Sequence, residues 1–126
     1  MNFAARVLVG MLVMTVLDVP MIKFVIAPTL SSRAKQLVAA RPDAAAGLIF
    51  YVLYVSLVVF LTHKLAKTTY EAGLYGALLG ALAYGTYEFT NKAVINGWPW
   101  AMVVVDFSWG IILTALVSAS VFYLFQ

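Results

Sequence analysis

Long apolar stretches fill almost the whole chain, and short polar segments separate them. A helix needs about 20 mainly apolar residues to cross a bilayer. The pattern predicts four such helices, over residues 3–27, 44–62, 70–96 and 98–125. We therefore expect an all-α polytopic membrane protein whose four transmembrane helices form one bundle and a single domain over residues 1–126.

Prolines and capping residues predict where these helices begin and end. Pro28 is expected to end the first helix, and Pro20 to kink it, because a proline inside a helix frees a carbonyl one turn earlier. No small-x-small cleavage site follows the first apolar run, so we expect it to be retained as a helix. Residues 29–42 are polar enough for an interfacial loop or a short surface helix, and Asp43 is a good N-cap for the second helix.

Composition supports a membrane location and excludes several chemistries. The chain is 64% apolar and 10% charged, whereas soluble domains are about 45–50% apolar and about 25% charged. It has no cysteine, so thiolate metal sites and disulfides are excluded. No Ser-His-Asp arrangement or phosphate-binding loop is present, and we expect neither a metal nor a cofactor.

The net charge of +3 is modest and favours contact with anionic lipid over nucleic acid. The lipid bilayer is the expected partner, in a bacterial inner membrane or an organellar inner membrane. We call the side that holds the first and third loops the basic side; it carries Arg33, Lys35, Arg41 and Lys92, against Arg6, Lys64 and Lys67 opposite. This difference is too small to fix the orientation. Trp98 and Trp100 suit a membrane interface, and His63 is expected in a solvated turn.

The third helix has an interior face that changes character along its length. Eight residues fall within about 60° of one direction at the 100° helical advance: Gly73, Gly76, Ala77, Gly80, Tyr84, Tyr87, Glu88 and Asn91. The first half of this face carries only small residues, and the Gly76-x-x-x-Gly80 spacing allows another helix to approach closely. We expect Gly73, Gly76 and Gly80 to pack against a neighbouring helix, and the polar second half to face the bundle interior.

Each helix also places a polar side chain at a similar depth. Asp18, Tyr51, Glu88 and Asp106 lie eight or nine residues from the basic-side ends of their helices, which corresponds to about 12–14 Å. In one bundle, the residues of this layer would surround a cleft open toward the basic side. The candidate substrate-binding or proton-exchanging residues are Asp18, Tyr51, Tyr54, Tyr84, Tyr87, Glu88, Asn91, Asp106 and Trp109.

The acids of this layer need an explanation, because a carboxylate at a helix centre costs about 2.5–3.5 kcal/mol on insertion scales. Two explanations are open for Glu88. It can form an ion pair with Lys92 one helical turn later, or it can have a functional role. Asp18 and Asp106 have no well-placed basic neighbour on their own helices, so we favour function for them. The alternative for both is hydrogen bonding to Tyr, Trp or Asn across the bundle.

Three segments of the second half resemble a known family. They are Tyr84-Gly85-Thr86-Tyr87-Glu88-Phe89-Thr90-Asn91, Trp98-Pro99 and Asp106-Phe107-Ser108-Trp109-Gly110. They resemble an uncharacterised family of small four-helix integral membrane proteins, mainly bacterial, classed as a domain of unknown function. Asp18 falls where that family has an acid in its first helix. The family usually has Asp at the position of Glu88 and an aromatic-rich stretch where this chain has Val19-Pro20-Met21. The resemblance implies the architecture and no established activity.

Three functions are compatible with these features. The first is binding or processing of an amphipathic, lipid-like molecule in the acid- and aromatic-lined cleft. The second is a small proton-coupled transporter, since four short helices and a first-helix acid look superficially like the small multidrug transporters; those, however, oligomerise through a small-residue motif in the fourth helix. The third is an accessory, non-catalytic subunit of a larger membrane complex, and a homo-oligomer is also possible. Whether the chain is an enzyme is left open.

Overall fold

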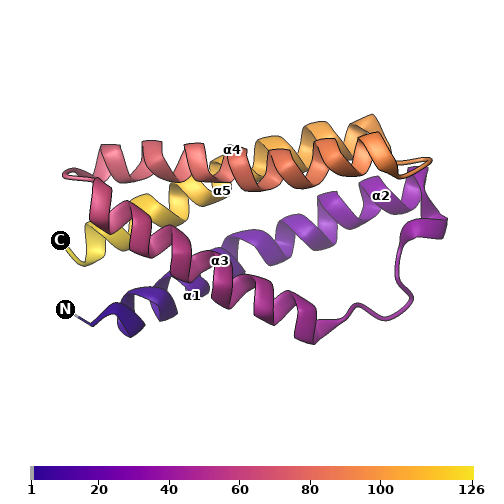
Figure 1. Cartoon of the computed structure of the whole chain (residues 1–126). Coiled ribbons are helices and arrows are strands. Elements are labelled where there is room, and N and C mark those ends of the chain that lie inside the picture. The colour runs from indigo at the N-terminus through magenta and orange to yellow at the C-terminus, as the bar shows by residue number, and fades with distance from the viewer. Residues whose placement is uncertain (1) are drawn as a thin grey trace.

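The computed structural model describes residues 2–126, and within this range the chain forms helices and no strand (Figure 1). The elements are α1 (Phe3–Met21), the π-helical segment η1 (Ile22–Ile26), α2 (Ala27–Arg33), the 3₁₀ segment η2 (Lys35–Leu37), α3 (Ala44–Leu65), α4 (Thr69–Val94) and α5 (Trp100–Leu124). Because α1, η1 and α2 are continuous, four long helical rods result. The predicted all-α bundle is confirmed.

Three of the rods are long and apolar enough to cross a membrane. They are Phe3–Arg33, Ala44–Leu65 and Trp100–Leu124, with mean hydropathies of 2.0, 2.4 and 1.9. The glycines and polar residues of α4 lower its hydropathy, and α4 lies along α5 for most of its length (Figure 1). That α4 also crosses the membrane stays a prediction.

The first rod is longer than its prolines predicted. Pro28 lies inside this continuous rod, just after the π-helical segment η1, and a local π-helical adjustment of this kind can accommodate the backbone groups that a proline frees. The prediction that Pro28 ends the helix is therefore wrong, and residues 29–33 continue the rod instead of joining the loop. The helix ends at Ala34, whose φ of −148° leaves the helical region. Pro20 lies inside α1, and the π-helical segment η1 begins two residues later.

The N-cap predicted for the second transmembrane helix is present. The side chain of Asp43 accepts a hydrogen bond from the backbone N–H of Ala46 at 3.1 Å, so it caps α3 as expected. Thr68 caps α4 in the same way by accepting from the N–H of Glu71 at 3.1 Å.

The apolar core is concentrated in the half of the bundle that holds both termini (Figure 1). It is formed by side chains of α1, α3 and α5: Met14, Val55, Val59, Leu113, Val117 and Val121. A smaller cluster of Trp98, Met102 and Val103 lies at the other end. Every buried residue of α3 lies at Val55 or beyond, so the first half of α3 leaves the core.

This asymmetry opens the bundle on one side. α3 and α4 meet at the short connection between them, and α3 diverges from α4 toward its own N-terminus (Figure 1). α4 and α5, by contrast, approach each other closely. Gly76 and Gly80 lie where their backbones are nearest, and Gly73 lies at the margin of the same contact. α3 therefore covers α4 and α5 at one end only; at the other end the first rod packs on α5 through Ile26 and Leu30.

Candidate functional site

Asp18 joins three helices through its carboxylate. The side chain is 5% exposed, and its Oδ1 accepts a hydrogen bond from the indole N–H of Trp109 at 2.9 Å. Its Oδ2 accepts from the hydroxyl of Tyr51. Both oxygens of this buried acid therefore have donors, supplied by α3 and α5. Asp18 therefore has the structural explanation that was the alternative to a functional role: its carboxylate is hydrogen-bonded to Tyr and Trp across the bundle.

Glu88 and Asp106 form a second acidic group, which is only partly satisfied. Glu88 is fully buried, and its Oε1 accepts from the indole N–H of Trp98 at 2.9 Å. Its Oε2 is buried, and no N–H or hydroxyl group among residues 2–126 donates to it. The carboxyl of Asp106 lies within hydrogen-bonding reach of that of Glu88. Two carboxyl groups that face each other in an apolar interior can share a proton in an O–H···O hydrogen bond.

The ion pair considered for Glu88 is not formed. Lys92 instead donates to the backbone carbonyl of Trp98 at 2.7 Å, and its ammonium lies 5.1 Å from the centre of the Trp100 ring. A backbone carbonyl and an aromatic face stabilise this cation at the end of the helix. Glu88 is therefore left to Trp98 and Asp106.

Tyrosines from α3 and α4 meet close to the two acidic groups. The hydroxyls of Tyr54 and Thr114 are 2.6 Å apart, and the rings of Tyr54 and Tyr84 meet edge to face with centres 6.0 Å apart. The ring of Tyr84 lies directly on Gly110, where a Cβ atom would collide with it. Tyr87 is half exposed, and its hydroxyl lies close to the side chain of Asn91.

A cavity of about 250 Å³ lies beside this network. It is lined by Phe50 from α3, by Ala83, Tyr84 and Tyr87 from α4, and by Asp106 from α5. Three of the predicted site residues therefore line one cavity. Glu88 lies behind Asp106, whereas Asp18, Tyr51 and Trp109 form a hydrogen-bonded group that does not line it, and neither do Tyr54 and Asn91.

Sequence reasoning missed three residues of this region. Phe50 precedes Tyr54 by one helical turn, and the two rings stack with centres 5.0 Å apart, so helical spacing from a candidate already chosen would have found it. Ala83 has no functional group in its side chain, so the sequence alone gives no reason to select it. The interface depth expected for Trp98 stays a prediction; its ring is buried and its indole N–H donates to Glu88, because the short turn after α4 folds the ring back into the bundle.

His63 also differs from its predicted position. It lies in the last turn of α3, not in a solvated turn, and its ring is 5.1 Å from that of Phe122. Within residues 2–126, no three His, Cys, Asp or Glu side chains gather in a group that could hold a metal ion.

Fold and site together define a class of protein: a small helical membrane bundle with paired acids beside an aromatic cavity. The chain belongs to the family described as "Predicted membrane protein (DUF2177)", whose model matches residues 3–123. It is therefore an integral membrane protein. No curated protein and no solved structure matches the chain.

Proposed function

We propose that the protein binds an amphipathic, lipid-like molecule in the cavity between α3 and α4. The observation that carries the proposal is the cavity itself: aromatic side chains form most of its wall, and Asp106 supplies an acidic group. Pockets of this kind, mainly apolar with a few convergent polar groups, are typical of small-molecule sites. The cavity lies where α3 diverges from α4, which gives an apolar tail a route toward lipid.

The acids limit the head group of this molecule. Glu88 and Asp106 bring two carboxyl groups together beside the cavity, so an anionic head group would be disfavoured there. A hydroxyl or an amine can instead donate a hydrogen bond to Asp106, and an ammonium would also neutralise the pair. The aromatic rings of Phe50, Tyr84 and Tyr87 suit either the tail or the face of a cation.

A proton-coupled transporter is the second candidate, and the paired carboxyls favour it. A pair that holds one proton can exchange it when a cationic substrate arrives. Asp18 is less suited to this role, since both of its oxygens already accept hydrogen bonds. In this version, Asp106 and Glu88 exchange the proton.

Replacement of Asp106 tests the proposal. Asp106→Leu is nearly isosteric and removes the acidic group, and we expect it to lower the amount of co-purified ligand about tenfold, the loss of one charge-assisted hydrogen bond of ~1.5 kcal/mol. Asp106→Asn, which still accepts a hydrogen bond, should lose less. The measurement is mass spectrometry of small molecules extracted from protein purified in lipid nanodiscs.

The matched control is Asp43→Asn, which changes an exposed acid outside the membrane and should retain the ligand. The same extract in all four proteins, with no molecule enriched over the surrounding lipid, would contradict the proposal. Recovery of a stable protein partner together with such an extract would favour the accessory subunit. Release of protons on addition of a cationic amphiphile, lost in Asp106→Asn, would favour the transporter.

A further inference from the structure

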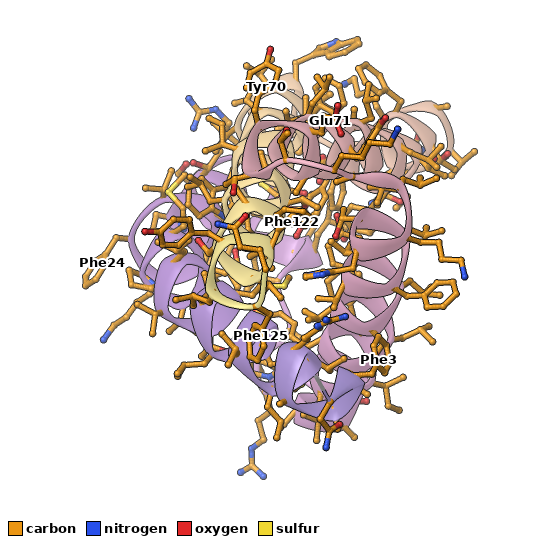
Figure 2. All side chains as sticks on the ribbon, turned by 90° about the vertical axis from the view of Figure 1, so that its left-hand side faces the viewer. Phe3, Phe24, Tyr70, Glu71, Phe122 and Phe125 are labelled. Atoms are coloured by element: carbon orange, nitrogen blue, oxygen red, sulfur yellow. The ribbon has the colours of Figure 1, made fainter. Side chains whose placement is uncertain are left out.

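A group of basic side chains lies at the opposite end of the bundle from the acids. Arg6 is in the first turns of α1, and His63 and Lys64 are in the last turn of α3. The two helix ends meet on the face of the molecule that holds both chain ends, which Figure 2 views directly, with Phe3 at its edge. Arg6 is near enough to His63 to interact with it electrostatically.

These side chains line a second cavity, of about 180 Å³. Its walls are Phe3, Arg6, Val59, Phe60, His63 and Lys64. The rings of Phe3 and Phe60 meet edge to face with centres 6.4 Å apart, and both are about half exposed. The cavity therefore combines nitrogen donors with an apolar rim that faces lipid.

Two nitrogen atoms in this cavity lack the partner that buried donors normally have. The Nε of Arg6 and the Nε2 of His63 are both shielded from solvent, and neither finds a hydrogen-bond partner among residues 2–126. An arginine Nε–H can only donate, so its missing partner is an acceptor. The two atoms belong to different helices but to the same cavity.

No carboxylate side chain supplies that acceptor. Of the five acids in the chain, Asp18, Glu88 and Asp106 belong to the interior groups already described, and Asp43 caps the far end of α3. Glu71 accepts from the backbone N–H of Lys67 at 2.7 Å and so caps the start of α4. The positive charges of Arg6 and Lys64 are left facing the cavity.

We propose that this cavity binds a phosphate-type anion at the membrane boundary. A phosphate oxygen would accept from Arg6 and His63, and Lys64 would neutralise the charge. The cavity lies at the ends of two membrane-spanning helices, the level at which lipid phosphates lie, and Phe3 and Phe60 provide contact for an acyl chain. The site is separate from the cleft at Asp106 and does not depend on the function proposed for it.

Chemical protection of Arg6 tests this site in the unaltered protein. The chain is placed in nanodiscs of digalactosyldiacylglycerol, a neutral lipid without phosphate, alone, with added phosphatidylglycerol, or with inorganic phosphate in solution. Arginines are then modified with phenylglyoxal and quantified by peptide mass spectrometry. We expect an anion in the site to slow modification of Arg6 about fivefold, on the basis of ~1 kcal/mol per basic residue near an anionic lipid. Arg33 and Arg41, at the other end, serve as internal controls.

Variants separate a built site from general attraction to a charged membrane. Lys64→Gln should raise the phosphatidylglycerol needed for half protection about fivefold. Lys67→Gln, three residues further along the chain and outside the cavity lining, should leave it unchanged. Protection by phosphatidylglycerol identifies a lipid as the source, and protection by inorganic phosphate alone identifies a free anion. Equal modification of Arg6 in all three preparations, or equal protection of the three arginines, would overturn the proposal.

Discussion

Gly80→Ala is expected to force α4 away from α5 and to lower the stability of the bundle markedly. A Cβ at Gly80 would collide with the carbonyl oxygen of Gly110 and lie 3.0 Å from the Cα of Ile111, and both are backbone atoms that cannot rotate away. Overpacking of this kind costs about 1–3 kcal/mol. Alanine is a better helix former than glycine by about 1 kcal/mol, which offsets only part of that cost.

The measurement is thermal unfolding of the detergent-solubilised protein by circular dichroism. Gly73→Ala is the matched control, because a Cβ there would meet the Cβ of Ala119 at 3.6 Å, an ordinary contact. It should unfold at the same temperature as the natural chain or slightly above it. If Gly80→Ala were as stable as Gly73→Ala, the close approach of α4 and α5 would be wrong.

Ala83→Trp is expected to fill the cavity and abolish ligand retention while leaving every acid in place. Ala83 lines the cavity beside Tyr84, so an indole at this position would occupy the volume that a ligand needs. Because the cavity is already empty of protein atoms, the larger side chain can be accommodated without opening the core. We expect near-complete loss of the co-purified molecule, measured by the same extraction and mass spectrometry.

Leu82→Trp is the control for this change. Leu82 is the neighbouring residue, 67% exposed on the outer side of α4, so the same indole placed there leaves the cavity free. It should retain the ligand at the level of the natural chain. Retention by Ala83→Trp as well would place the ligand elsewhere, and loss in both variants would indicate a general effect of the substitution on the helix.

The main features of the fold follow from the sequence because the bilayer imposes them. Apolar runs must be helical in lipid, since only helices satisfy their own backbone hydrogen bonds. The end of the first helix was harder to predict, because a proline can end a helix or be accommodated inside one. A π-helical segment before Pro28 decides between these outcomes, and no local sequence signal marks it.

The candidate site was predicted in part. Depth and helical face selected Asp106, Tyr84 and Tyr87, which line one cavity. They also selected Asp18, but its partners Tyr51 and Trp109 come from two other helices, and only tertiary packing shows that both of its oxygens are satisfied. Spacing along one helix suggested Lys92 as the partner of Glu88, whereas a turn in the chain brings Trp98 there instead.

A structure determined in lipid nanodiscs tests the central claim most directly, that the opening between α3 and α4 is a binding cleft. We expect non-protein density in the cavity, with a polar end beside Asp106 and a tail that leaves past Phe50. The first half of α3 should stay apart from α4. A structure in which this half of α3 packs against α4, with Phe50 and Tyr87 in contact and the cavity closed, would contradict it.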